Sequence, residues 1–141
     1  MIGLKIFKTK ILKNYKGNIL KYLNKNDKFI KKFGEVYFSY IKKGKQKGWN
    51  LHKKNNCFLI CVDGTVHIHL IDGRKKKRSF NSEKKIKLTK KEPKILKIPP
   101  GVWFSFKSTK SNSILSNFME EPHQKKESIK SRIIKGYSIK D

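Results

Sequence analysis

The 141-residue sequence lacks alanine altogether and is poor in acidic residues and arginine. Ten Asp and Glu stand against 36 Lys and Arg, and only three of these are arginine, at positions 74, 78 and 132. A formal charge of +26 is typical of nucleic-acid-binding proteins. Reading phosphates and base edges, however, leans heavily on the bidentate guanidinium of arginine. We therefore interpret the lysines as a solvated surface produced by compositional bias, and we expect no specific nucleic-acid partner. A basic nucleic-acid-binding barrel remains a less favoured alternative.

Long apolar runs are also absent. No stretch approaches the roughly 18 to 20 apolar residues that span a bilayer, and residues 1–5 lack the apolar core of a signal peptide. We expect a cytoplasmic protein without a membrane partner. A single domain is expected from the length.

Cysteine is scarce, with only Cys57 and Cys61. Their spacing along an apolar strand places both on one face but too far apart for a disulfide. We predict two free core thiols and no metal site, because a second Cys or His pair with ligand spacing is not evident. The sequence also lacks a glycine-rich phosphate loop, a nucleophile elbow and paired carboxylates at useful spacing. This excludes the common kinase, hydrolase and glycosidase patterns.

Short apolar segments separated by turn signals make up most of the chain. The pattern predicts strands over residues 2–12, 19–23, 35–41, 58–62, 65–71, 86–88, 95–98, 102–107 and 113–118. Asp63-Gly64, between two alternating apolar runs, predicts a hairpin. Strands at about ten-residue spacing favour an all-β sandwich or barrel.

Several polar and aromatic residues are candidates for chemistry. The segment 48–54 (GWNLHKK) holds an aromatic ring, an amide, an imidazole and two cations, and His52 is either a pocket residue or a structural one. His67 and His69 alternate with apolar residues, which predicts that both lie on a solvent face. Trp103 follows a rigid Pro-Pro-Gly turn and is either core or the flat wall of a sugar or base site. For Asn117 and His123 the pattern does not separate capping from ligand contact.

A set of short motifs is shared with one enzyme family. These motifs are residues 33–39 (FGEVYFS), 47–54 (KGWNLHKK), 72–74 (DGR), 98–103 (IPPGVW), Asn117 and 122–123 (PH). In order and spacing they resemble the cupin-type relatives of dTDP-4-dehydrorhamnose 3,5-epimerase, from about residue 2 to residue 127. The sugar 3,4-ketoisomerases are a neighbouring group with a similar Gly-x-His-x-His-Lys region.

The resemblance implies a cupin-type double-stranded β-helix (jelly roll) over residues 1–127, followed by a polar C-terminal tail over 128–141. It implies a homodimer without cofactor that isomerises a nucleotide-linked 4-keto-6-deoxy sugar for surface polysaccharides. His52 would be the base, and Tyr37 would return a proton. The residues that would bind the substrate are Lys47, Trp49, Asn50, Lys54, Trp103, Asn117 and His123. No metal is implied, because the His-x-His pair of metal-binding cupins reads Asn50-Leu51-His52 here and Phe104 stands where their late His would fall.

Asn50 is the main departure from the family pattern, because relatives usually carry His there and an amide cannot accept a proton at neutral pH. Phe58 and Gln124-Lys125 also depart from it. These changes keep a second hypothesis open: a catalytically silent cupin that binds a sugar nucleotide or a partner enzyme.

Overall fold

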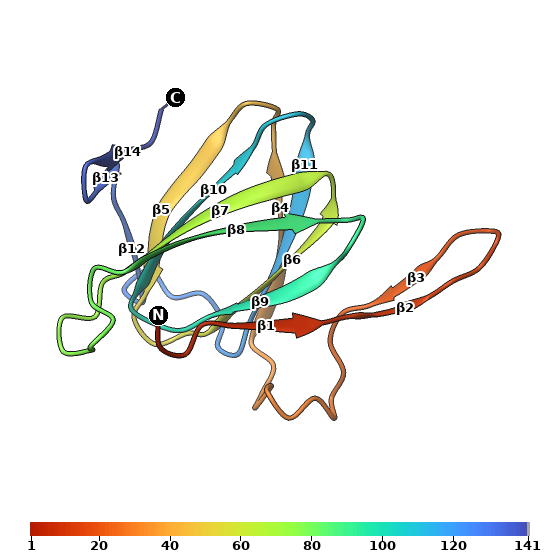
Figure 1. Cartoon of the computed structure of the whole chain (residues 1–141). Helices are drawn as coiled ribbons and strands as arrows, with labels where there is room; N and C mark the ends of the chain where they lie inside the picture. The colour runs from red at the N-terminus through yellow and green to blue at the C-terminus, as the bar shows by residue number, and fades with distance from the viewer. Residues whose placement is uncertain (141) are drawn as a thin grey trace.

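The protein is an all-β molecule, as the sequence predicts. The computed structural model describes residues 1–140, and within them the chain forms strands and loops without any helix (Figure 1). It follows that no helix of these residues is able to cross a membrane. Residue 141, the last of the expected tail, lies outside the described residues.

Two five-stranded antiparallel sheets form the body. The first sheet has the order β1 (Lys5–Lys8), β9 (Lys94–Ile98), β6 (Cys57–Asp63), β11 (Ser113–Met119) and β4 (Glu35–Ile41). The second has the order β12 (Ser128–Lys130), β5 (Gln46–His52), β10 (Val102–Ser108), β7 (Thr65–Asp72) and β8 (Glu83–Thr89). The chain crosses repeatedly from one sheet to the other, which is the jelly roll that the resemblance implies.

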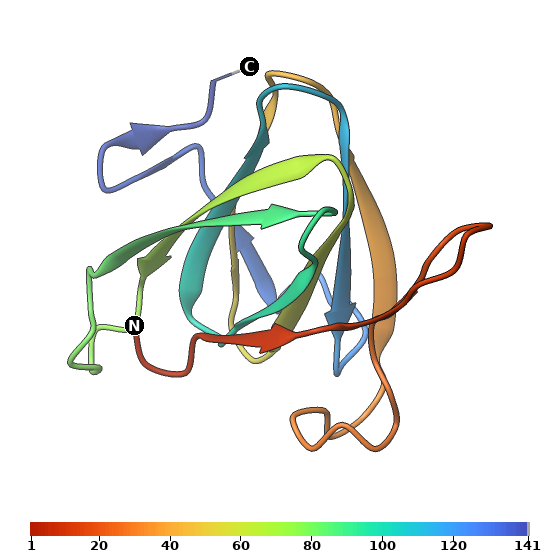
Figure 2. The same ribbon diagram turned by 45° about the vertical axis from the view of Figure 1, so that its right-hand side comes forward.

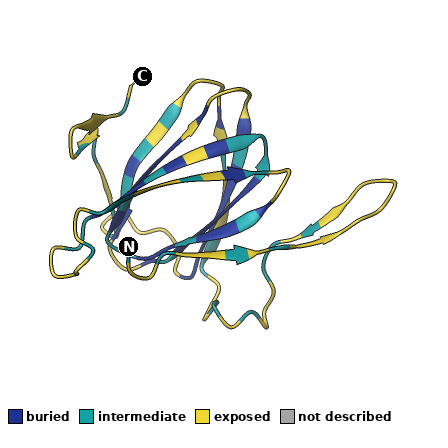
Figure 3. Cartoon of the chain, in the orientation of Figure 1, coloured by how far each residue is buried: buried dark blue, intermediate teal, exposed yellow. Residues whose placement is uncertain are grey.

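The core is formed by side chains from both sheets, and buried residues lie on strands of each (Figure 3). Leu59, Leu96 and Leu115 of the first sheet and Val66 and Leu70 of the second are at most 2% exposed. Burial of each such side chain contributes about 1.5–3 kcal/mol, so the apolar residues on the facing sides of the strands hold the two sheets together.

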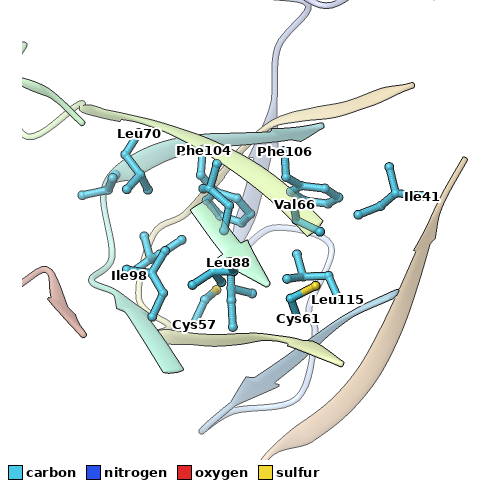
Figure 4. Packing of buried hydrophobic residues seen from close by; sticks show 14 of the residues in the cluster. Ile41, Cys57, Cys61, Val66, Leu70, Leu88, Ile98, Phe104, Phe106 and Leu115 are labelled. Carbon is cyan, nitrogen blue, oxygen red and sulfur yellow. The ribbon is translucent and has the colours of Figure 1, made fainter. Parts of the chain in front are cut away.

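The two cysteines belong to this core (Figure 4). Both thiols are free and buried, as predicted. Burial raises the pKa of Cys57 to about 12 and that of Cys61 to about 11. They are therefore protonated packing groups at neutral pH and poor nucleophiles.

The hairpin predicted at Asp63-Gly64 is wrong. β6 pairs with β9 and β11, whereas β7 pairs with β8 and β10, so this turn is a corner between the sheets. Gly64 has a φ of +73°, and a Cβ there would lie 2.3 Å from Ser113 Oγ. Asp-Gly supplies the left-handed backbone that a tight turn needs, whether or not the flanking strands pair.

Gly17 does lie in a hairpin turn, between β2 (Lys10–Leu12) and β3 (Ile19–Lys21).

The β2–β3 hairpin projects away from the body in both ribbon views (Figures 1 and 2). The segment that follows it, residues 22–30, folds back over the outer face of the first sheet. There Tyr22 and Phe29, together with Leu20 from the base of β3, pack against the buried Phe58 and Phe118. This cover gives the first sheet a second, smaller apolar cluster.

The C-terminal residues 127–138, which we call the C-terminal strap, extend the second sheet. They overlap the expected polar tail, and they contain β12 and the small hairpin of β13 (Ile133–Ile134) and β14 (Tyr137–Ser138). β12 pairs with β5, and the ladder continues where the backbones of Trp49 and Ser131 exchange two hydrogen bonds of 3.0 Å. The strap is thus anchored along the edge of β5.

The end of the strap also covers the outer face of the second sheet. Trp49 Nε1 donates to the carbonyl of Tyr137 at 2.9 Å, and the Tyr137 ring contacts the imidazole of His69. Glu83 pairs with Lys135 at 2.7 Å and with His69 at 3.1 Å. The expected solvent face holds for His67, which is exposed, but not for His69, which is half-buried beneath the strap.

Candidate functional site

An open pocket of about 630 Å³ lies between β4, β5, β10 and the beginning of the strap. Its lining is formed by Glu35, Tyr37, Ser39, Lys47, Gly48, Asn50, His52, Phe104, Phe106, His123, Ser128 and Lys130. Phe104 and Phe106 are buried apolar side chains, and the lining residues other than Gly48 and these two are polar or charged. Such a pocket suits a polar ligand with one apolar face.

A β-bulge in β5 brings three functional side chains to the pocket. Phe104 lies opposite Asn50 and Phe106 lies opposite Lys47, so three steps on β5 match two on β10. The extra residue turns Lys47 onto the same face as Asn50 and His52. Gly48, with a φ of +116°, permits this, because a Cβ there would lie 2.8 Å from the Phe104 carbonyl oxygen.

His52 is held by a carboxylate from the strap. Its Nδ1 lies 2.6 Å from Glu127 Oε2, and its ring stacks on Phe104. The other oxygen of Glu127 accepts hydrogen bonds from the backbone N–H groups of Asn55 and Lys54. Burial alone would raise the pKa of Glu127, but these donors and His52 hold it below its ordinary value. Because an ionised Glu127 accepts the proton on Nδ1, Nε2 of the neutral imidazole is the nitrogen left free to accept another.

Tyr37 faces the pocket from β4. Its hydroxyl accepts a hydrogen bond of 2.9 Å from Asn117 Nδ2, on the neighbouring strand β11. Burial raises the pKa of Tyr37, and the charge of Glu35 adds to this effect. The phenol is therefore a neutral proton donor at physiological pH. The buried Asn117 Oδ1 has no hydrogen-bond partner among the described residues.

Charge is unevenly distributed in the pocket. Glu35 contacts the backbone N–H of His123 at one end, where His52 also lies. At the other end Lys47 donates to Ser39 Oγ at 2.9 Å, and between the two ends Lys130 lies beside Asn50 in the register of β12 and β5. The pocket thus offers a carboxylate at one end and cations elsewhere.

The structure brings most, but not all, of the predicted site residues together. Tyr37, Lys47, Asn50, His52 and His123 line the pocket, and Asn117 touches it through the Tyr37 hydroxyl. Three others do not contribute to the lining, namely Trp49, Lys54 and Trp103.

Backbone geometry explains these three exceptions. The bulge turns Trp49 to the outer face of the sheet, where it is fully buried under the strap. Trp103 alternates with the inward-facing Val102 and Phe104 and lies beside Gly73. Lys54 follows the end of β5 with an exposed side chain.

Glu127, Ser128 and Lys130 are site residues that sequence reasoning missed. Glu127 is 75 residues from its partner His52, and no local pattern links the two. The described residues contain no group of three His, Cys, Asp or Glu side chains placed to hold a metal ion. The arrangement combines a histidine with an orienting carboxylate, a neutral phenol and an ammonium group. Such a set is suited to general acid–base catalysis.

Comparison with known proteins gives one family match. Residues 3–133 match the family described as FdtA: WxcM-like, C-terminal. A comparison with curated protein sequences gives no match.

Solved structures with the same fold include several sugar-nucleotide enzymes. A dTDP sugar isomerase from Desulfovibrio desulfuricans G20 superposes with a TM-score of 0.89 at 26% identity, covering 92% of this chain and 84% of the other. A dTDP-4-dehydrorhamnose 3,5-epimerase from Sulfolobus tokodaii gives 0.83 at 21% identity, over 91% and 76%. ChmJ, a 3'-monoepimerase from Streptomyces bikiniensis in complex with dTDP-quinovose, gives 0.83 at 12% identity, over 92% and 70%. The jelly-roll fold is thereby confirmed.

The Glu127 carboxylate predicts a pH-dependent contribution to stability. Because its pKa is lowered by folding, this contribution is complete above its ordinary pKa of 4.5 and is lost as the pH falls through the lower pKa of the folded state. We expect Glu127→Gln to lower the free energy of unfolding by about 1.5–3 kcal/mol at pH 7. Urea denaturation at several pH values measures this difference, which should shrink below pH 4.5. A difference that stays constant from pH 7 to pH 3 would contradict the assigned charge.

Proposed function

Because the chain belongs to the family FdtA: WxcM-like, C-terminal, we propose that it is an isomerase or epimerase of a dTDP-linked 4-keto-6-deoxy sugar. The observation that carries the proposal is the His52–Glu127 pair in a polar pocket. The similar structures support it, because they include a dTDP sugar isomerase and dTDP-4-dehydrorhamnose 3,5-epimerases.

His52 is the proposed base. A carbon next to a ketone is acidic enough for an imidazole to remove its proton when the resulting enolate is stabilised. Nε2 of His52 takes the proton, and the C–H electron pair forms the enolate of the sugar ring. Glu127 keeps the imidazole in the required tautomer and stabilises its positive charge once it is protonated.

The proton returns to the enolate in one of two ways. Delivery to the original carbon from the opposite face inverts it, which is an epimerisation. Delivery to the former carbonyl carbon, with transfer of the proton of the neighbouring hydroxyl to the former carbonyl oxygen, turns that hydroxyl into the new ketone, which is a ketoisomerisation. Tyr37 is the proposed donor, because its hydroxyl stays protonated and Asn117 fixes its position.

The cations of the pocket suit the anionic part of such a substrate. Lys47 is positioned by Ser39, and Lys130 extends from the strap over the same pocket. An ammonium group stabilises a diphosphate or an enolate by charge, without the fixed fork of arginine. Phe104 and Phe106 form an apolar floor on which a sugar ring can pack.

A second candidate function is supported by Asn50. Asn50 lies in the pocket beside His52, and its amide has no proton-accepting nitrogen. If the reaction requires two bases, one for each of two carbons, this chain has only one of them on β5. The protein would then bind a sugar nucleotide, or support a partner enzyme, without turning the sugar over.

We also propose that the protein works as a cytoplasmic homodimer in surface polysaccharide synthesis. The outer face of the edge strand β4 carries three exposed apolar side chains, Val36, Phe38 and Tyr40. Among the described residues β4 pairs only with β11, so its free edge is open to another strand. A second copy of the chain would cover both features.

Proton exchange is the direct test of the chemistry. We expect the purified protein to exchange the C3 proton of dTDP-4-keto-6-deoxyglucose in deuterated water, with new sugar signals in the proton NMR spectrum. Exchange at C5 as well would indicate a double epimerisation. Saturable binding without exchange at either carbon would favour the silent alternative. The absence of both binding and exchange would refute the proposal.

The base assignment is tested by His52→Ala, which should lower kcat by at least about 100-fold because the proton acceptor is lost. Binding of dTDP and the circular dichroism spectrum should be unchanged. His67→Ala, on the exposed face of β7, is the matched control and should keep full activity. Turnover that survives in the His52 variant would disprove the assignment.

Restoring the family residue tests the role of Asn50. In a pocket that retains the rest of the machinery, Asn50→His should raise kcat/KM by about tenfold or more, because a second proton acceptor becomes available. The rate of deuterium incorporation at each carbon is the measurement. If neither rate rises, Asn50 does not limit the reaction.

The dimer is tested by sedimentation equilibrium. The wild type should sediment as a dimer, and the double variant Phe38→Lys, Tyr40→Lys as a monomer, because two buried charges would oppose association. Phe80→Lys changes a comparably exposed ring in the loop between β7 and β8 and should leave the dimer intact. A wild-type monomer at micromolar concentration would refute the dimer.

A further inference from the structure

Glu35 is a pocket carboxylate that the proposed proton transfers do not use. It is the first residue of β4 and lies on the same face of the strand as Tyr37 and Ser39. An acidic side chain is unexpected in a pocket of a protein with 36 basic and only ten acidic residues. Its presence there therefore calls for a specific reason.

The fold uses only part of this carboxylate. Oε2 accepts one hydrogen bond of 3.2 Å, from the backbone N–H of His123. Within residues 1–140 the structure records no other hydrogen bond and no ion pair to this carboxylate. A half-buried carboxylate keeps several acceptor sites, so Glu35 has capacity left for a ligand.

Glu35 also divides the pocket electrostatically. It lies at the end that His52 and His123 line, whereas Lys47 is bound to Ser39, four residues further along β4. A ligand with a diphosphate at one end and hydroxyl groups at the other fits this arrangement in one direction only. In that direction the diphosphate would lie toward Lys47 and Lys130, and the sugar would lie toward Glu35 and the proposed base.

We propose that Glu35 determines which sugars the pocket accepts. Its carboxylate accepts hydrogen bonds from the hydroxyl groups of a neutral sugar and repels a sugar that carries a carboxylate of its own. This inference rests on the proposed function and names the substrate class more closely: neutral sugars linked to dTDP, with uronic acids excluded. Discrimination of this kind works by penalising the wrong ligand as much as by attracting the right one.

Three stable ligands test the proposal in binding experiments that involve no turnover. Isothermal titration calorimetry measures the Kd of dTDP, dTDP-α-D-glucose and dTDP-α-D-glucuronic acid for the full chain. The wild type should prefer the glucose compound over the glucuronic acid compound by roughly tenfold or more, as expected for two like charges in a partly screened site. Glu35→Gln should reduce this preference by about the same factor.

The variant isolates the charge. The glutamine carbonyl can still accept the hydrogen bond from His123, and the side chain keeps its size. Glu121→Gln is the matched control, because Glu121 is exposed and pairs with Lys32 outside the pocket; its preference should equal that of the wild type. The affinity for dTDP should change less than twofold in either variant.

The outcomes separate this inference from the proposed function. If both sugar nucleotides bind and the preference is the same in the wild type and in Glu35→Gln, the role of Glu35 is refuted while the proposed function stands. If Glu35→Gln tightens dTDP itself tenfold, the carboxylate faces the diphosphate and the orientation is wrong. If none of the three ligands binds the wild type, the proposed function fails and this inference fails with it.

Discussion

The pocket depends on the close approach of β5 to β10 at Gly48. Only a residue without a side chain fits there, because a Cβ would lie 2.8 Å from both the Phe104 carbonyl oxygen and the Ser105 Cα. The close approach at Gly48 allows the bulge in β5, and the bulge gives this strand two functions. Its inner face presents Lys47, Asn50 and His52 to the pocket, and its outer face presents Trp49 to the strap.

The large positive charge and the pocket are largely separate features. Most lysines lie on solvated surfaces, where each contributes little to the free energy of folding and does not determine the structure. Inside the pocket two functional groups have defined side-chain partners: Lys47 contacts Ser39, and His52 contacts Glu127. The proposed chemistry therefore depends on a small number of positioned groups, and the net charge adds a long-range field that attracts anions.

Sequence reasoning predicted the class and most of the strands, because apolar alternation is a local signal of a half-buried strand. It failed where distant parts of the chain decide. Asp63-Gly64 has the composition of a hairpin turn but joins two sheets, since pairing is chosen by strands elsewhere. Trp49 and Trp103 follow conspicuous motifs, yet a bulge and strand alternation turn them away from the pocket. Glu127 carried no local signal at all.

The C-terminal strap both forms one wall of the pocket, through Ser128 and Lys130, and holds His52, through Glu127. β12 is a three-residue edge strand with one neighbour, the kind of element that opens locally before the rest of a sheet. Each time it detaches from β5, Glu127 leaves His52, and Ser128 and Lys130 leave the rim. In the proposed mechanism, Glu127 therefore orients the base only while β12 is paired with β5. During synthesis the pocket is complete only after residues 127–130 have been made and have paired with β5, because Glu127 follows His52 by 75 residues in the chain.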